Sequence, residues 1–483
     1  MAIVSGVIMV PLYLKFIPTD VYGAWLASGN VLIWFSFFDP GLTVVLQQRI
    51  GSAYGKRDYQ TIRELLGGGL FIAGVISISI IAIGFIIAPY LPLFLSLPPG
   101  IDKSLIVQAF SIAVIGTSLT VFSFSISAIN QGFQSSLGFG LTNFIVTALM
   151  TVLTAVLLYK GFGLLAIAIA SIFGGVFYTL GQGTYLIWRL TDEKIGFKFS
   201  FNNISALTKL LSYTFLGRVS GILANNVDLF VVSRFLGPET VTILSLTRKA
   251  PDYSKEFVNQ PSVAFMPAIS HLTGSGEIDK ARKVLIRLIH MLLWILCLTV
   301  GGLIALNDDF VRLWVGPYLF AGKTINLIIC VSLIFTFTAN CFGNICMALG
   351  NIKGNSLAGL VQSLVFIPLV IFGTKYFGLL GTVLAPSVAI LAVSAWYYSR
   401  TFSRLLKLSV QDRKNIMYEG FLALAVMVSL TLGFSWCYPE NWFRFFALVA
   451  VFCFLYSCLI YLVSMNFRCE IKGVIQKLRI LPT

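Results

Sequence analysis

Charged side chains are scarce in this sequence. Lys, Arg, Asp and Glu make up 11% of its 483 residues, whereas hydrophobic residues make up 57%. A soluble domain has about 25% charged residues, so a soluble fold of this size could not cover its surface with so few charges. Disordered chains are also excluded, because they are polar and rich in charge. The composition therefore indicates a membrane protein that crosses the bilayer many times.

Patterns that carry enzymatic or metal chemistry are lacking as well. The sequence has two histidines, and none of its eight cysteines belongs to a Cys-x-x-Cys pair. We therefore expect neither a metal site nor a disulfide framework. The sequence contains no P-loop, no Gly-x-Gly-x-x-Gly turn and no His-Glu-x-x-His motif, and its hydrophilic stretches are too short for an ATPase domain. These absences predict a protein that is not an enzyme and holds no cofactor.

Positive charge is in excess, with 34 Lys and Arg against 19 Asp and Glu. In a soluble protein this excess would suggest a nucleic-acid partner. In a membrane protein the simpler cause is that Lys and Arg collect in the cytoplasmic loops. We therefore expect that the chain does not bind nucleic acid.

Apolar runs of sufficient length define most of the expected spans. They lie near residues 1–17, 25–45, 66–88, 105–128, 138–158, 162–188, 211–236, 288–306, 325–348, 356–374, 378–399, 416–436 and 444–464. The segment 241–268 is ambiguous, because it carries five charged residues: Arg248, Lys249, Asp252, Lys255 and Glu256. Two arguments identify it as a further span, which brings the number to about fourteen.

The distribution of Lys and Arg is the first argument. If 241–268 is a span and the N-terminus is cytoplasmic, most of these residues fall in cytoplasmic loops. If the segment is a loop, every later loop changes side and most of the positive charge lies outside. The positive-inside rule thus favours the additional span, with both termini in the cytoplasm.

An internal repeat is the second argument. Short motifs recur in the same order with an offset of about 220 residues. Pro40 pairs with Pro261, and the sequence FGLL at 162–165 returns at 377–380. The repeat predicts an all-α polytopic protein with two lobes of six helices in the same orientation, followed by two further helices. We expect the N-lobe at 1–195, the C-lobe at 196–407, and the last two helices with a basic cytoplasmic tail at 408–483.

The charges of 241–268 fall on one side of the expected helix. A stripe is formed by residues spaced by four, three and four positions: Arg248, Asp252, Lys255 and Asn259. Lys249 and Glu256 flank this stripe. A charge at the bilayer centre costs roughly 2.5–3.5 kcal/mol, so the stripe must face protein, water or other charges. Either it lines a substrate pathway, or it forms a fixed ion-pair network that holds helices together.

The helix before it, 211–236, carries Arg218, Asn225 and Asp228 on one broad face. In the first half of the chain, Asp39 is the one charge well inside a predicted span. An isolated carboxylate in that position is expected to be protonated or paired, which suits a site of ion coupling or gating. The alternative is that Asp39 caps or pairs locally near the cytoplasmic end of its helix.

At this point the sequence resembles the flippases of the MOP superfamily, the branch with Wzx-type flippases for O-antigen and capsule repeat units. The resemblance runs from about Met1 to Lys407. It is carried by these motifs: Tyr22-Gly23, Asp39-Pro40-Gly41-Leu42, Gly55 with Asp58, Gln131-Gly132, Asn225 with Asp228, Phe235-Leu236-Gly237 and Trp314-Val315-Gly316. The expected number of about fourteen spans differs from the twelve that are common in the family. In this number the chain resembles the lipid II flippase subgroup.

The resemblance implies a MATE-like architecture with a central cavity that opens alternately to each side of the bacterial cytoplasmic membrane. The implied substrate is an undecaprenyl-pyrophosphate-linked oligosaccharide for surface polysaccharide, and polymerase or ligase machinery would be the partner. A proton or sodium ion would drive the cycle. The alternatives are a multidrug exporter of the same superfamily, a lipid II flippase, and a non-transporting scaffold for polysaccharide assembly.

The excess of basic residues inside the expected spans suits an anionic pyrophosphate. We predict that the substrate is bound by the cations and amide of the two helices: Arg218, Lys249, Lys255, Arg248 and Asn225. When the site is empty, Asp228, Asp252 and Glu256 would keep these cations paired, because an unpaired buried charge is costly. Together with Asp39, these three acids are the expected residues for coupling or gating.

Overall fold

A computed structural model of the chain describes residues 2–34, 42–55, 57–95, 97, 100, 102–133, 136–196, 198, 227–265, 269, 277–349, 351–406, 408–434 and 437–480. All regular secondary structure within these ranges is helical. The predicted all-α class is therefore confirmed. Internal contacts divide the chain into two compact units, which are Met1–Thr242 and Ile243–Thr483.

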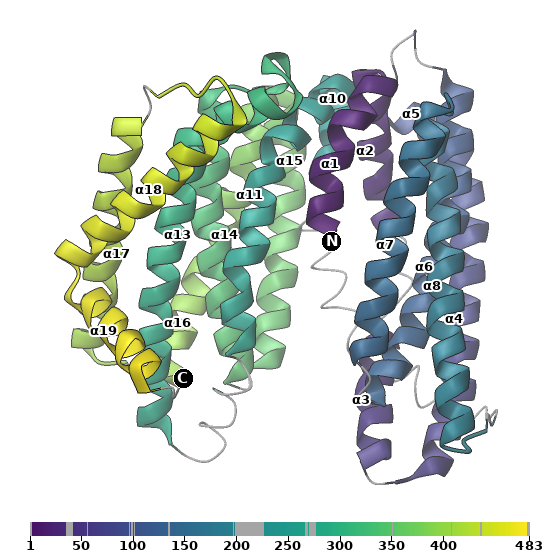
Figure 1. The fold of residues 1–483 in the computed structure, drawn as a ribbon, viewed down its shortest axis with the longest axis horizontal. Helices are drawn as coiled ribbons and strands as arrows, with labels where there is room; N and C mark the ends of the chain where they lie inside the picture. Colours follow the sequence, from purple (N-terminus) through teal and green to yellow (C-terminus); the bar gives the residue numbers. More distant parts are fainter. Residues whose placement is uncertain are drawn as a thin grey trace. The chain divides into compact units, whose positions relative to one another are not determined.

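The first unit consists of long helices that run side by side (Figure 1). In chain order they are α1 (Ala2–Phe16), α2 (Thr19–Trp34), α3 (Leu42–Gly55), α4 (Tyr59–Ile87), the 3-10 turn η2 (Ala88–Tyr90), α5 (Leu91–Phe94), α6 (Lys103–Gly132), α7 (Ser136–Tyr159), α8 (Leu164–Asp192) and α10 (Asp228–Leu236). Helix α6 packs against α3, α4 and α8 and forms the centre of this unit.

Small residues allow the closest of these contacts. A Cβ atom added to Gly116 of α6 would lie 2.5 Å from the backbone of Ser171 in α8, and one added to Gly175 would lie 2.7 Å from the carbonyl oxygen of Gly116. Between α4 and α6, the hydroxyls of Ser77 and Ser118 donate to each other's carbonyl oxygens at 3.1 and 2.8 Å. Such close packing and interhelical hydrogen bonds stabilise helix pairs in lipid, where the hydrophobic effect does not.

The second unit begins within α11 (Pro238–Ala264) and continues through longer helices. These are α13 (Ile278–Val315), the 3-10 turn η3 (Pro317–Leu319), α14 (Lys323–Ala348), α15 (Ile352–Ala389), the π-helical turn η4 (Ile390–Ser394), α16 (Ala395–Leu405), α17 (Val410–Phe434), α18 (Trp442–Val463) and α19 (Met465–Ile480). Helix α13 contacts α14, α17 and α18. The predicted lobe boundaries at 195 and 407 stay predictions.

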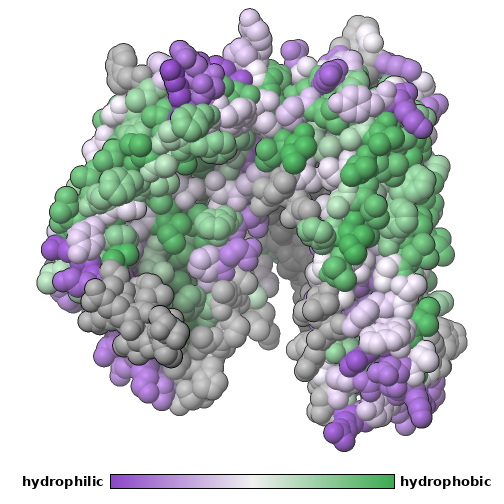
Figure 2. Space-filling view, viewed as in Figure 1, coloured by the Kyte–Doolittle hydropathy of each residue, from purple (hydrophilic) through white to green (hydrophobic). Residues whose placement is uncertain are grey.

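Nine helices in the described part of the chain are long and apolar enough to cross a membrane. Helix α11 is not among them, because of its charges, but its 27 residues would extend about 40 Å, which exceeds a hydrocarbon core of about 30 Å. Apolar side chains cover the middle of the visible face of each unit, and hydrophilic ones lie at both ends (Figure 2). The helices agree with about fourteen spans.

Several predicted bounds were wrong. The spans predicted to start at 66 and 288 belong to helices that begin at Tyr59 and Ile278, because polar turns continue each helix beyond its apolar run. Asp58 caps the first of these helices by accepting a hydrogen bond from the backbone N–H of Thr61 at 3.0 Å. Hydropathy marks the part of a helix that suits lipid, whereas a cap marks where the helix begins.

Helix α15 doubles back on itself at Gly378, which has φ 60° and ψ −142°. The hydroxyl oxygens of Thr374 and Thr382, eight residues apart, lie 2.9 Å from each other. A Cβ atom added to Gly381 would lie 2.0 Å from the carbonyl oxygen of Gly373. This hairpin gives the two predicted spans 356–374 and 378–399.

The same backbone conformation occurs where the sequence repeats. Gly163, in the first copy of FGLL, has φ 51° and ψ −127° and precedes α8. Gly378, in the second copy, has nearly the same angles. The turn is thus repeated in structure as well as in sequence, which supports an internal duplication.

We expect Gly163→Ala and Gly378→Ala to destabilise the protein by about 1–3 kcal/mol each, because side chains are strained at these angles. Gly183→Ala in α8 is the matched control, since no atom lies within 4 Å of its added Cβ and its φ is ordinary. The apparent Tm of each variant in detergent measures the effect. Equal Tm values for all three variants would contradict this account of the turns.

We expect α11 to cross the membrane. With a cytoplasmic N-terminus, Glu277 then lies inside and Tyr318, beyond the other end of α13, lies outside. Each residue is changed to Cys in a protein whose eight native cysteines are replaced, and both positions are exposed. An impermeant maleimide should label the Tyr318→Cys protein in intact cells and the Glu277→Cys protein only after permeabilisation. The reversed pattern would show that α11 is a loop.

Candidate functional site

Helix α11 carries the largest group of charges predicted to face a substrate. Its buried side includes Thr247, Pro251, Val258 and Ser262, which lie on one helical stripe. The charged residues lie on the adjacent side, where Asp252 and Glu256 are exposed and the three cations are half-buried. The structure therefore confirms that these charges share one face of one helix.

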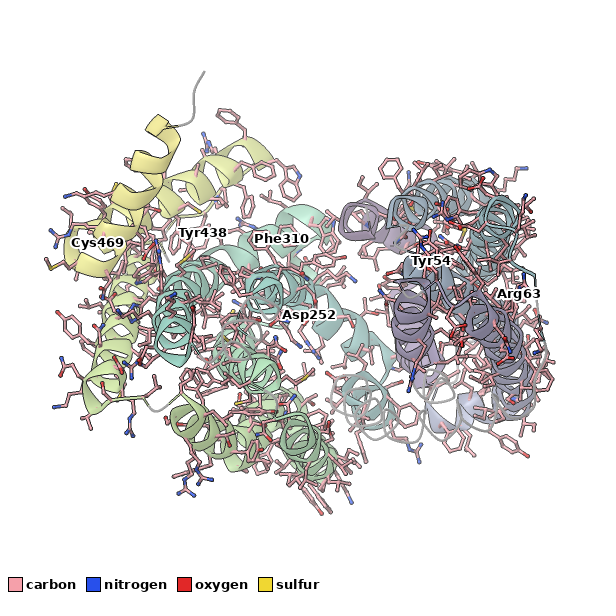
Figure 3. The ribbon with its side chains drawn as sticks, turned by 90° about the horizontal axis from the view of Figure 1, so that it is seen from below. Tyr54, Arg63, Asp252, Phe310, Tyr438 and Cys469 are labelled. Atoms are coloured by element: carbon pink, nitrogen blue, oxygen red, sulfur yellow. The ribbon has the colours of Figure 1, made fainter. Side chains whose placement is uncertain are left out.

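The ion pair between Arg248 and Asp252 is long. The guanidinium of Arg248 lies 3.9 Å from the carboxylate of Asp252, and their side chains are 27% and 53% exposed. Figure 3 labels Asp252 on α11. The ammonium of Lys249 lies 5.5 Å from the ring centre of Tyr253, within the range of a cation–π contact. A strong charge-assisted hydrogen bond measures about 2.7–2.9 Å, so the Arg248–Asp252 pair can exchange partners readily.

Uncharged groups anchor α11 to the helices behind it. The amide of Asn307 in α13 donates to the carbonyl oxygen of Thr247 at 2.9 Å, and the Thr247 hydroxyl accepts from the backbone N–H of Ala321 at 2.9 Å. Farther along, the amide of Asn344 in α14 donates to the hydroxyl of Ser262 at 2.9 Å. Both prolines of the helix, Pro251 and Pro261, are accommodated inside it. These bonds hold the helix through groups outside its charged face.

The sequence prediction missed these anchoring amides. Asn307 and Asn326 are both buried, and the Asn307 amide also donates to the side-chain oxygen of Asn326 at 2.7 Å. Their signal in the sequence is an amide at the edge of an apolar run, which is costly to bury unless it is hydrogen-bonded.

The other predicted site residues have different placements. Asp228 is buried in the first turn of α10, in the first unit, where its carboxylate accepts from the backbone N–H of Leu229 at 2.9 Å. Arg218, Asn225 and Asp39 lie outside the described residues. The structure thus brings together five of the predicted residues on α11 and does not test their proximity to the remaining ones.

One polar cluster joins α3 and α8 at an end of the first unit. The hydroxyl of Tyr54 donates to the carboxylate of Glu193 at 2.7 Å and accepts from the guanidinium of Arg189 at 3.0 Å. The hydrogen bond to Glu193 is the main reason that the pKa of Tyr54 is raised. Figure 3 labels Tyr54 and Arg63. The backbone carbonyl oxygen of Arg63 accepts a hydrogen bond from the backbone N–H of Lys198 at 3.1 Å. This cluster fastens helix ends together.

Another cluster explains the Trp314-Val315-Gly316 motif. Trp314 stacks on Phe310 with ring centres 5.3 Å apart, and Phe310 in turn contacts Trp442 of α18 at 6.1 Å. Gly316, with φ 108°, ends α13 in a conformation that suits glycine. The motif therefore terminates a helix and packs it against α18, near the position of Phe310 in Figure 3.

Within the described residues, no group of three or more His, Cys, Asp or Glu side chains is arranged to hold a metal ion. Separately, the cations of the α11 face can bind an anion through charge-assisted hydrogen bonds.

Comparisons with known proteins place this geometry in context. No curated protein matches the chain in sequence. The chain is similar in structure to the lipid II flippase MurJ in an inward closed conformation, with 17% identity, a TM-score of 0.73 and 97% of each chain covered. It is also similar to an inward-facing multidrug resistance MATE family transporter of the MOP superfamily, with 15% identity, a TM-score of 0.69, and 83% of this chain and 94% of the other covered.

A MATE transporter from Vibrio cholerae has 14% identity and a TM-score of 0.60, with 85% of this chain and 94% of the other covered. At these identities the likenesses show a shared fold. The family model described as "Polysaccharide biosynthesis protein" matches residues 70–318, which is just over half of the sequence. The chain is a multi-pass membrane protein that belongs to this polysaccharide biosynthesis family and has the fold of MOP-superfamily flippases and transporters.

Proposed function

We propose that this protein is a flippase for undecaprenyl-pyrophosphate-linked oligosaccharide repeat units, working by alternating access in the bacterial cytoplasmic membrane. The observation that carries the proposal is the face of α11, where Arg248, Lys249 and Lys255 outnumber Asp252 and Glu256 in a polysaccharide biosynthesis protein. Cations on a helix of spanning length can bind an anion, and the pyrophosphate of a lipid-linked sugar is one.

The three cations would serve the pyrophosphate in different ways. The guanidinium of Arg248 can bind two phosphate oxygens at once, whereas the ammonium groups of Lys249 and Lys255 act as compact point charges. When the site is empty, Asp252 lies 3.9 Å from Arg248. Binding would exchange that carboxylate for phosphate oxygens without leaving Arg248 uncompensated, which lowers the cost of opening the site.

Transport requires that the substrate interact differently with two states of the protein. The Arg248–Asp252 pair would supply that difference, because bending of α11 between the two residues changes their separation. Helix α11 contains two prolines, Pro251 and Pro261, which remove backbone hydrogen bonds at two points along it. The charged residues lie just before Pro251 and between the two prolines. Bending of the helix at these points would therefore move the charges relative to one another.

A second candidate is a lipid II flippase. The similarity to MurJ covers 97% of both chains, more of this chain than the MATE transporters cover. Lipid II also carries a pyrophosphate, so the α11 face suits both substrates. A multidrug exporter is disfavoured for cationic drugs, because the cations on α11 would repel them. A scaffold that transports nothing has no need of five charges on one helix.

Deletion of the gene distinguishes these functions. A repeat-unit flippase predicts that a lipid-linked oligosaccharide accumulates on the cytoplasmic face while cell-wall synthesis continues. Accumulated lipid II with cell lysis would identify the second candidate. Unchanged surface polysaccharide with increased drug sensitivity would contradict the proposal and indicate an exporter. Polymerase or ligase partners would be found by crosslinking in the same strains.

We expect Lys249→Gln and Lys255→Gln each to reduce flipping by about tenfold or more, because each removes a charge-assisted contact to phosphate. Arg444→Gln is the matched control. Arg444 is an exposed cation on α18, and its guanidinium lies 2.6 Å from the carboxylate of Glu440. Flipping is measured with lipid-linked oligosaccharide in proteoliposomes. If each inactive variant is also depleted or unfolded in detergent, the charges form a structural network and the substrate site lies elsewhere.

Asp39 is proposed to take part in ion coupling or gating. We expect Asp39→Asn to abolish transport at normal protein abundance, because a group that must gain and lose charge during the cycle cannot be replaced by an amide. Asp102→Asn serves as control, since Asp102 caps α6 and asparagine caps helices equally well. Full activity of both Asp39→Asn and Asp39→Ala would return Asp39 to a local structural role.

A further inference from the structure

A buried carboxylate lies in the second unit, outside the α11 face. Glu419 is on α17 with 2% of its surface exposed. Three neutral groups donate hydrogen bonds to it: the indole N–H of Trp294 at 3.2 Å, the hydroxyl of Ser464 at 2.8 Å and the amide of Asn466 at 2.7 Å. The apolar cluster around it includes Ala423 and Ile460. Both oxygens of the Glu419 carboxylate are therefore used as hydrogen-bond acceptors inside this cluster.

Among the described residues, no Lys or Arg forms an ion pair with Glu419. An ion pair of the same bundle joins Arg287 of α13 to Glu470 of α19. Neutral donors stabilise a buried negative charge only in part, and an uncompensated charge in a low-dielectric interior is costly. The site therefore needs one unit of positive charge from another source.

His290 is in a position to supply that charge. It lies one turn before Trp294 on α13, with 5% of its surface exposed, and the two ring centres are 6.1 Å apart. Its Nε2 atom is buried without a hydrogen-bond partner. A neutral imidazole with an unoccupied nitrogen can accept a proton, and histidine does so near physiological pH more readily than any other side chain.

We propose that Glu419 and His290 together form a proton-binding site that takes up one proton from water. The proton adds to the Nε2 atom of His290, the carboxylate keeps its three hydrogen bonds, and the net charge of the pair changes from −1 to 0. This proposal deepens the proposed function and rests on it in one respect, because it names the proton as the ion that can be coupled to transport.

Other titratable groups lie around the pair on α13, α18 and α19. On α18, the hydroxyl of Tyr456 donates to the carbonyl oxygen of Trp294 at 3.0 Å, close to the thiol of Cys297 on α13. On α19, Arg468 lies 3.5 Å from the carbonyl oxygen of Ser464, and Glu470 pairs with Arg287. None of these groups forms a hydrogen bond to Glu419 or His290 in the described structure.

Occupation of the site has a mechanical consequence. Two of the three donors to Glu419, Ser464 and Asn466, lie at the junction of α18 and α19. Phe467, in the same junction, packs edge-on against Trp294 with ring centres 4.9 Å apart. Loss of the proton leaves a net negative charge at this junction. The packing of α18 and α19 against α13 and α17 therefore depends on pH. In the predicted topology the junction is at the cytoplasmic end of the spans, where protons are accessible.

The chain allows a direct test because it has only two histidines, His271 and His290. In a His271→Gln protein with labelled histidine, held in a nanodisc, the remaining NMR signal reports the protonation of His290. We expect this imidazole to bind one proton as the pH is lowered from 8 to about 4. We expect Glu419→Gln to lower the ratio of protonated to neutral imidazole by about tenfold at a fixed pH, which corresponds to about 1.4 kcal/mol.

Glu470→Gln is the matched control, because it removes a carboxylate of the same bundle that is already paired with Arg287. It should change the ratio much less than Glu419→Gln does. An imidazole that stays neutral over this pH range, or a ratio unaffected by Glu419→Gln, would overturn the proposal. If Glu419→Gln does not fold, the titration of the His271→Gln protein alone decides.

Transport adds a second readout. Flipping by the unmodified protein should vary with pH, and Glu419→Gln and His290→Gln should both remove that dependence while Glu470→Gln preserves it. Proton binding without any flipping of lipid-linked oligosaccharide would contradict the proposed substrate and leave the proton site standing. A pH dependence that persists in both variants would overturn the role of this site in coupling.

Discussion

Every polar group in the hydrocarbon region of a membrane must find its partner within the protein, because no water is available there. Helices satisfy this constraint for the backbone, and much of the packing described above satisfies it for side chains. The serine pair between α4 and α6, the asparagines behind α11 and the three donors around Glu419 are separate solutions to the same problem. Where a buried atom has no partner among the described residues, as at Nε2 of His290, the protein can still bind a proton.

The sequence was sufficient to predict the helices and their repeat. Apolar runs of spanning length have few alternatives, and the FGLL motif recurs with the backbone conformation that its glycines impose at Gly163 and Gly378. The five charges on one face of α11 followed from helical periodicity alone. These features depend on local geometry, which sequence spacing records directly.

Features that depend on contacts between distant segments were not predictable in the same way. Glu419 and His290 are 129 positions apart in the sequence and each resembles an isolated polar residue in an apolar run. Only the packing of α13, α17 and α18 shows that they share one environment. The charged residues of α11 are numerous and form a pattern in the sequence. One carboxylate and one imidazole form no pattern, although each has a larger effect on the free energy when it is buried.

The hairpin at Gly378 also bears on how the protein enters its membrane. The two arms are joined by a single residue in a non-helical conformation, and they are already in contact at Thr374 and Thr382. Arms this close leave the ribosome almost together, so the pair can be inserted as one unit whose backbone hydrogen bonds are satisfied from the start. Lys375 lies beside the turn, and in the predicted topology its ammonium must be carried across the bilayer during that step. The turn at Gly378 therefore links the membrane insertion of two spans.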